Sequence, residues 1–205
     1  MTSGTDNKKE WFGKARLDYF SPFVSLWLSC NSWYNFHYAS IKGDRAHIDK
    51  LKSDTTNQNA LFQNFKILFE GGPSKDRTSF FTNLELLQFS LSRAALKPDK
   101  LKYPLSFEMA LLDYSQITTD LGYVCLIVSN AKRKNGTLKK NVNGVDLGDL
   151  VLLNNSQQVF ACVLETIYQV RCMLVHGELE PTDYNHEVVK YCYLILHDLM
   201  KKFCS

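Results

Sequence analysis

The chain has 205 residues, of which 45% are hydrophobic and 22% are charged, and its formal net charge is +3. This length and balance are typical of one globular domain with a sizeable core, over residues 1–205, and they exclude an intrinsically disordered chain. A charge of +3 is too small to indicate a nucleic-acid partner by itself.

Two longer apolar runs, residues 23–30 and 123–128, fall well short of the ~20 residues that cross a bilayer. The first 11 residues lack the apolar segment of a signal peptide. We therefore predict a cytoplasmic protein with no membrane contact. The cysteines form no C-x-x-C pair and have no histidine at zinc-finger spacing, so we expect reduced, mostly buried thiols and neither a metal nor a cofactor. They are Cys30, Cys125, Cys162, Cys172, Cys192 and Cys204.

In chain order, residues 1–10 are predicted to form a polar, frayed leader. Ser21 and Pro22 are typical of a helix start, because a hydroxyl can cap the helix and proline suits its first helical position. The segment from there to residue 41 has apolar side chains at intervals of three and four, which predicts a core helix. They are Phe23, Leu26, Trp27, Cys30, Trp33 and Tyr34.

Three further helices are predicted before the middle of the chain. The first is short and polar, over residues 43–52, and the second covers residues 59–69 and ends at the sequence GGP, residues 71–73. The third begins at a cap supplied by Ser74 or Asp76 and continues to about residue 96. The stretch KPDKLKYP, residues 97–104, then breaks the helical pattern.

Residues 105–153 form the least regular part of the chain, and we expect an insertion or irregular region there. Residues 123–136 have the β-branched content of a strand that enters a hairpin, but they also fit a helix capped by Asp120. Of these two alternatives we predict the helix. Residues 144–149 are predicted to form a loop.

Two long amphipathic helices are predicted to close the chain. The first extends from about Ser156, with a continuous apolar face through Leu174, and ends at Gly177. The second begins at a cap supplied by Asp183 and repeats apolar residues at intervals of three and four as far as Phe203. The fold class expected from these patterns is an all-α antiparallel helical bundle.

Arg171 and His176 are separated by four residues at the end of an apolar helix, where packing requires neither. On a continuous helix their side chains would point about 140° apart, but Gly177 can end the helix and turn the imidazole towards Arg171 or towards a partner subunit. An arginine fork suits phosphate oxygens, and a histidine can move a proton near neutral pH. The pair therefore suits metal-free cleavage of a phosphodiester.

A structural role fits the same spacing. Arg171 would then pair with an acid such as Glu165 or Glu178, and His176 would interact with the last carbonyl groups of its helix. Spacing alone favours this interpretation, because arginine and histidine occur at this separation in many proteins.

The residues around Arg171 and His176 give further evidence about function. The phrase IYQVRCMLVHG, residues 167–177, resembles the signature helix of the HEPN superfamily, in which an arginine precedes a histidine by four to six residues and a glycine follows. The stretch SLWLSCNSWYN, residues 25–35, is similar to an early HEPN helix, and residues 183–203 are similar to the helix that follows the motif. Residues 52–153 do not align.

This resemblance implies a HEPN-like bundle that forms a homodimer, with the Arg and His motifs of two chains facing each other. Many members are metal-independent endoribonucleases of toxin–antitoxin, phage-defence and RNA-processing systems, with a cognate antitoxin or defence-complex protein as partner. Carried over by position, Arg171 would stabilise the phosphate and His176 would act as acid and base. Cys172 stands where a polar residue is common, and a catalytically silent module that binds a protein or RNA is the alternative.

Other residues are candidates for supporting roles. Asn31 is mildly unfavourable inside a helix, which suggests a specific hydrogen bond near the motif. The basic stretch, residues 130–141, contains five cations and no acid around an Asn-Gly turn signal; it could contact an RNA backbone or simply be a solvated loop. Its cations are Lys132, Arg133, Lys134, Lys139 and Lys140. We expect His186 and His197 to be non-catalytic.

Overall fold

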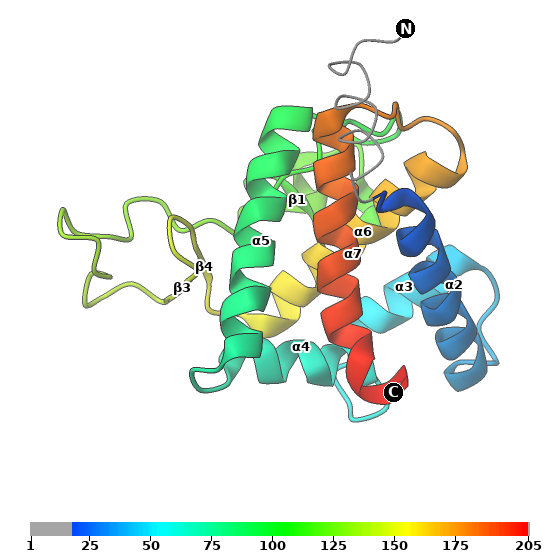
Figure 1. Cartoon of the computed structure of the whole chain (residues 1–205), viewed down its shortest axis with the longest axis horizontal. Helices are drawn as coiled ribbons and strands as arrows, with labels where there is room; N and C mark the ends of the chain where they lie inside the picture. Colours follow the sequence, from blue (N-terminus) through cyan, green and yellow to red (C-terminus); the bar gives the residue numbers. More distant parts are fainter. Residues whose placement is uncertain (1–17, 205) are drawn as a thin grey trace, which may run out of the picture.

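The computed structural model describes residues 18–204, and this part of the chain is mostly helical (Figure 1). The predicted leader, residues 1–10, lies outside the described residues. The helices are α2 (Phe20–His37), α3 (Asp44–Ser53), α4 (Ala60–Glu70), α5 (Lys75–Ala94), α6 (Ser156–Val175) and α7 (Asp183–Cys204). Between α5 and α6 the elements are short: β1 (Ala110–Leu111), β2 (Tyr123–Val124), β3 (Gly144–Asp146), β4 (Val151–Leu153), and 3-10 turns at Tyr114–Gln116 and Asp120–Gly122.

The start of α2 differs slightly from the prediction. The helix begins at Phe20, whose N–H donates to Asp18 Oδ1 at 2.9 Å, so a carboxylate before the helix takes the role expected of the Ser21 hydroxyl. Pro22 was expected at the first helical position, but it is the third residue of α2. The apolar stripe is confirmed, because four of its six members are fully buried: Phe23, Trp27, Cys30 and Tyr34.

Side-chain caps fix the starts of α4, α5, α6 and α7, whereas α3 begins at Gly43 without one. Ser74 Oγ accepts the Arg77 N–H at 3.1 Å, so the first of the two proposed caps for α5 is confirmed. At the start of α7, Thr182 Oγ1 accepts the Asn185 N–H at 3.2 Å. The cap of the last helix is therefore Thr182, one residue before the predicted Asp183.

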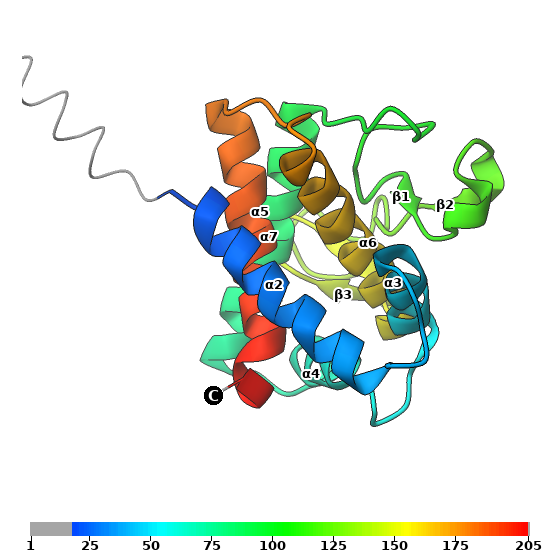
Figure 2. The same cartoon turned by 90° about the vertical axis from the view of Figure 1, so that its right-hand side faces the viewer.

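Helix α7 packs against α5, α2 and α4, whereas α6 packs chiefly against α3 and α4. Figures 1 and 2 show α6 and α7 running in opposite directions and crossing at an incline. An aromatic cluster joins three helices: the Phe65 ring lies 5.2 Å from Phe69, 5.6 Å from Phe80 and 5.4 Å from Phe160, measured between ring centroids. The core therefore holds α6 firmly from its first turns.

The helix predicted for residues 123–136 is wrong. This stretch contains β2, which pairs antiparallel with β1, and later residues bridge to β4 and to each other. Leu126 is fully buried, its N–H donates to Phe107 O at 2.8 Å, and its carbonyl accepts the Leu153 N–H at 2.8 Å. Backbone partners from distant segments therefore replace helical hydrogen bonds here. The predicted loop at residues 144–149 is partly strand, because β3 pairs with β4.

Asp54, directly after α3, is a buried carboxylate with several donors. Its Oδ1 accepts the Thr56 N–H at 2.9 Å and the Thr56 hydroxyl at 2.6 Å, while Oδ2 lies 3.2 Å from both Lys50 Nζ and the Tyr38 hydroxyl. Burial alone would raise the pKa of this carboxyl, but the hydrogen bonds outweigh burial and lower the pKa to about 2.

This shift predicts an acid-labile contribution to stability. Because the folded pKa lies below the ordinary value of 3.8, folding favours the ionised carboxyl; the contribution is present above pH ~4 and disappears as the pH falls towards about 2. We expect Asp54→Asn to cost about 2 kcal/mol at pH 7 and progressively less on acidification. Urea unfolding of both proteins between pH 7 and pH 2.5 measures this difference, and a constant difference would contradict the assignment.

Candidate functional site

The C-terminal end of α6 carries the Arg and His pair. Residues 159–170 are all buried, whereas Arg171 and Cys172 are half-buried and His176 is exposed. The helix ends as predicted: the His176 N–H donates to Cys172 O at 3.0 Å, and Gly177 adopts a left-handed conformation with φ of +73°. The pair thus lies where α6 leaves the core.

Arg171 is anchored on the side of α2 and α3. Its Nη2 lies 3.2 Å from Asp44 Oδ2, and its guanidinium carbon lies 5.6 Å from the centre of the Trp27 ring. Its Nε is buried and has no hydrogen-bond partner among residues 18–204. Asp44, rather than the expected Glu165 or Glu178, is therefore its acidic partner, and the guanidinium keeps an unused donor.

Asn31 joins the same polar group through Asp44. Its Nδ2 donates to Asp44 Oδ1 at 3.0 Å and contacts the Tyr34 hydroxyl at 2.7 Å, and that hydroxyl lies 3.2 Å from the same carboxylate oxygen. Burial and the nearby Asp44 carboxylate both raise the pKa of Tyr34, so its hydroxyl stays protonated and can donate. The expected hydrogen bond of Asn31 near the motif is present, although it reaches Arg171 only through Asp44.

His176 lies on a different side of the helix end. It lines a pocket of about 260 Å³ together with Cys172, Gln169, Tyr168, Tyr114 and Lys100, among others, and Arg171 does not line this pocket. Within residues 18–204, no hydrogen bond or ring contact joins Arg171 to His176. Cys172 connects the two sides, because its sulfur lies 3.9 Å from Arg171 Nη1 and the residue also lines the pocket.

Beneath this surface lies a buried carboxylate, Glu165, that the sequence did not reveal as a centre of charge. Its two oxygens each lie 2.8 Å from the Arg45 fork, and Lys52 Nζ lies 2.7 Å from Oε2. Burial would raise the pKa of Glu165, but Arg45 and Lys52 outweigh it and lower the pKa, so the carboxyl stays ionised. The Arg45 guanidinium lies over the rings of Tyr114 and Tyr168, at 4.4 Å and 4.9 Å.

The basic stretch does not lie beside the pair. In Figure 1 it belongs to the irregular arm that projects beyond α5, whereas the end of α6 lies on the opposite side of the molecule. Lys132 is already paired, with Asp146 at 2.7 Å and with the Gly148 carbonyl. The other four cations are exposed and have no acidic partner among residues 18–204: Arg133, Lys134, Lys139 and Lys140.

The remaining histidines of α7 lie away from the pocket. His186 is 8% exposed, accepts the Tyr19 N–H on Nε2 at 3.4 Å and packs against the rings of Tyr19 and Phe20. His197 is exposed and packs against Tyr193. Neither lines the pocket that contains His176.

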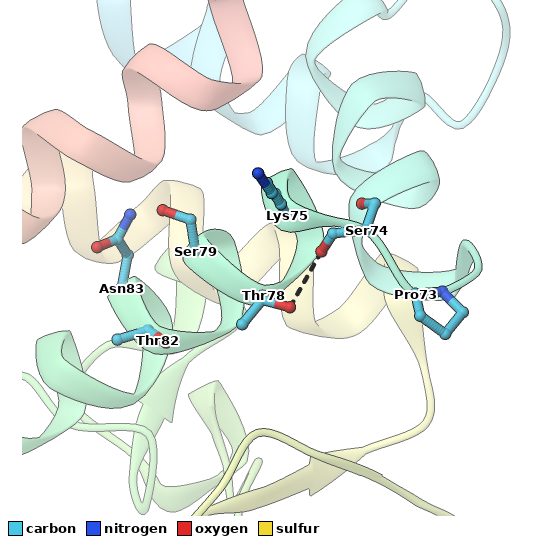
Figure 3. Close-up of a pocket in the computed structure, with 7 residues that line it drawn as sticks. All are labelled: Pro73, Ser74, Lys75, Thr78, Ser79, Thr82 and Asn83. Carbon is cyan, nitrogen blue, oxygen red and sulfur yellow. Dashed lines mark hydrogen bonds between the residues drawn. The ribbon is translucent and has the colours of Figure 1, made fainter.

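A larger hollow of about 650 Å³ lies along the first half of α5 (Figure 3). Its lining offers hydroxyls, the Asn83 amide and one cation, Lys75, but no carboxylate, histidine or cysteine; the drawn contact is the bond from Thr78 Oγ1 to Ser74 O at 3.0 Å. This hollow therefore lacks an acid–base group.

Within residues 18–204 no cluster of three histidine, cysteine or acidic side chains could hold a metal ion. Helix α6 is long and apolar enough to cross a membrane by length and composition, but 72% of the relevant stretch is buried inside the protein.

No protein-family model, curated protein or solved structure matches the chain. Function must therefore be argued from the geometry at the end of α6.

Proposed function

We propose that the protein is a metal-independent, HEPN-type endoribonuclease whose site is built from Arg171 and His176. The observation that carries the proposal is the end of α6 itself. There, a half-buried guanidinium emerges on one side of the helix end, and an exposed imidazole that lines a pocket emerges on the other. Charged and titratable groups concentrated at a cavity rim are typical of functional sites.

The two side chains supply complementary steps of phosphodiester cleavage. His176 accepts the proton of a ribose 2′-hydroxyl, whose oxygen attacks the adjacent phosphorus. The bond from phosphorus to the 5′ oxygen then breaks, and that oxygen takes up a proton. Arg171 stabilises the extra negative charge of the pentacoordinate transition state. The products are a 2′,3′-cyclic phosphate and a 5′-hydroxyl, and the scheme requires no metal.

Separation of Arg171 from His176 within one chain supports a composite site. Because a two-fold axis places identical helix ends opposite one another, Arg171 of one copy can meet His176 of the second copy. We therefore propose a homodimer, with a HEPN-like antiparallel bundle in which residues 105–153 are an insertion. A cytoplasmic toxin–antitoxin or phage-defence setting, with a cognate antitoxin or defence-complex protein as partner, belongs to the same proposal.

One observation favours the alternative of a silent HEPN module that binds RNA or a protein. Arg171 is held by Asp44 and stacked on Trp27, and its neighbour Cys172 lacks the polar group common at that position. Such a module would form dimers and bind its partner without changing the length of RNA.

The experiment that separates the two functions is cleavage of a mixed RNA pool by purified protein in excess EDTA. We expect the wild type to shorten the RNA and His176→Ala to leave it intact. The matched control is His197→Ala, an exposed histidine outside the pocket, which should cleave like the wild type. RNA that stays intact with the wild type, or cleavage that survives in His176→Ala, would reject the nuclease assignment.

A further inference from the structure

The pocket beside His176 has the size and the walls of a site for one flat ring. Its volume is about 260 Å³, which is below the ~300–1,000 Å³ of pockets for drug-sized ligands. Tyr114 contributes an aromatic wall whose face away from Arg45 can stack with a nucleobase, whereas the buried Tyr168 ring packs against Arg45 and Trp27. Lys100 is exposed at the same pocket and can meet a phosphate.

Gln169 gives this pocket a fixed hydrogen-bond acceptor. The side chain lines the pocket although the residue is only 7% exposed, and its Nε2 donates to Glu165 Oε1 at 2.8 Å. Because the Glu165 carboxylate accepts and cannot donate when ionised, the amide nitrogen must face it. The carbonyl oxygen of Gln169 is therefore the end of the amide that is not held by Glu165, and among residues 18–204 the side chain has no other hydrogen bond.

Other groups in the wall are also acceptors. Asp99 and Glu178 line the same pocket as Gln169, and their carboxylates are acceptors when ionised. A base with an exocyclic amine offers N–H donors to these groups. Uracil has one ring N–H, which can meet one acceptor, but the carbonyl oxygens on either side of it would then face the other acceptors.

We propose that the pocket between Tyr114, Gln169 and His176 binds one nucleobase of the RNA substrate and selects adenine, cytosine or guanine over uracil through the Gln169 carbonyl oxygen. This inference rests on the proposed nuclease function, to which it adds a base preference next to the scissile phosphate. His176 at the rim places the proton-transferring imidazole beside the nucleotide whose base the pocket holds.

The test measures binding without cleavage. The four 2′-deoxynucleoside 3′-monophosphates of adenine, cytosine, guanine and uracil lack the attacking hydroxyl, and NMR titration of the protein gives their dissociation constants. We expect the three amine-bearing nucleotides to bind about 10-fold more tightly than the uracil nucleotide, with amide shifts around Tyr114, Gln169 and His176. Equal affinities for all four, or shifts confined to another surface, would overturn the proposal.

Two variants test whether Gln169 causes the preference among nucleobases. Gln169→Met keeps the approximate side-chain volume and removes the acceptor, so we expect it to abolish the preference. Lys100→Ala should weaken the binding of all four nucleotides by the same factor, so the ratios of their dissociation constants should stay unchanged. A preference that survives in folded Gln169→Met would refute the role of Gln169; if that variant does not fold, the wild-type comparison of the four nucleotides still decides.

The same titration is independent of the nuclease assignment. Equal affinities for the four nucleotides together with RNA cleavage in EDTA would reject the base-binding pocket and support the nuclease function. A clear preference among the nucleotides together with no cleavage of any RNA would support the base-binding pocket and reject the nuclease function.

Discussion

Glu165→Ala is expected to lower the free energy of unfolding by about 3–5 kcal/mol, because it leaves two cations without their carboxylate. Lys52 is 7% exposed at its side chain, and Arg45 is 24% exposed. Neither can move fully into water without leaving the ring contacts and helix packing around it. Chemical denaturation followed by circular dichroism measures the loss.

Matched changes separate this charge effect from packing. Glu108 is exposed and has no ion pair among residues 18–204, so Glu108→Ala should change stability by less than about 0.5 kcal/mol. Replacing a buried ion pair as a unit is far less costly than breaking it, so Glu165→Gln combined with Lys52→Met should be more stable than Glu165→Ala. A loss below about 1 kcal/mol for Glu165→Ala would contradict the buried-charge account.

Arg171→Ala is expected to reduce the rate of RNA cleavage by about 10²–10³-fold, the usual cost of removing one group that stabilises transition-state charge. Asp44 keeps its bonds to Asn31 and Tyr34, so the fold should lose no more than about 1 kcal/mol. Single-turnover cleavage assays and thermal melts measure the two effects separately.

Arg171→Lys provides a sharper version of the same test. Lysine keeps the charge but lacks the planar fork and its stacking surface, so most of the activity should still be lost. Arg93→Ala is the control, because Arg93 is exposed and lies over the rings of Phe89 and Tyr184, away from the pocket. Full activity in both Arg171 variants, or an equal loss in Arg93→Ala, would show that Arg171 has no special role.

The helices were predictable because local signals and burial agree in them. Ser74 caps α5, Gly177 ends α6, and the apolar stripe of α2 faces the core, as spacing indicated. Residues 123–136 were not predictable in this way. Their β-branched side chains fit both states, and the decision depends on the backbone of Phe107 and Leu153, which are distant in sequence.

The site was predictable only in part. The sequence placed Arg171 and His176 at one helix end, but it could not place them on different sides, because the ion pair with Asp44 and the pocket depend on α3 and on residues 98–114. Asp44 was missed, because it lies 13 residues from Asn31 in the sequence and only the packing of α3 brings the two together. Arg45 and Glu165 are 120 residues apart, and no spacing rule connects them.

The most direct test of the account is the chemistry of the RNA ends after incubation with the protein in excess EDTA. Mass spectrometry of the fragments distinguishes a 2′,3′-cyclic phosphate from a 3′-hydroxyl. If Arg171 and His176 catalyse cleavage, cyclic phosphates form with the wild type and none form with His176→Ala. Fragments that end in a 3′-hydroxyl, or cyclic phosphates that persist in His176→Ala, would contradict catalysis by Arg171 and His176.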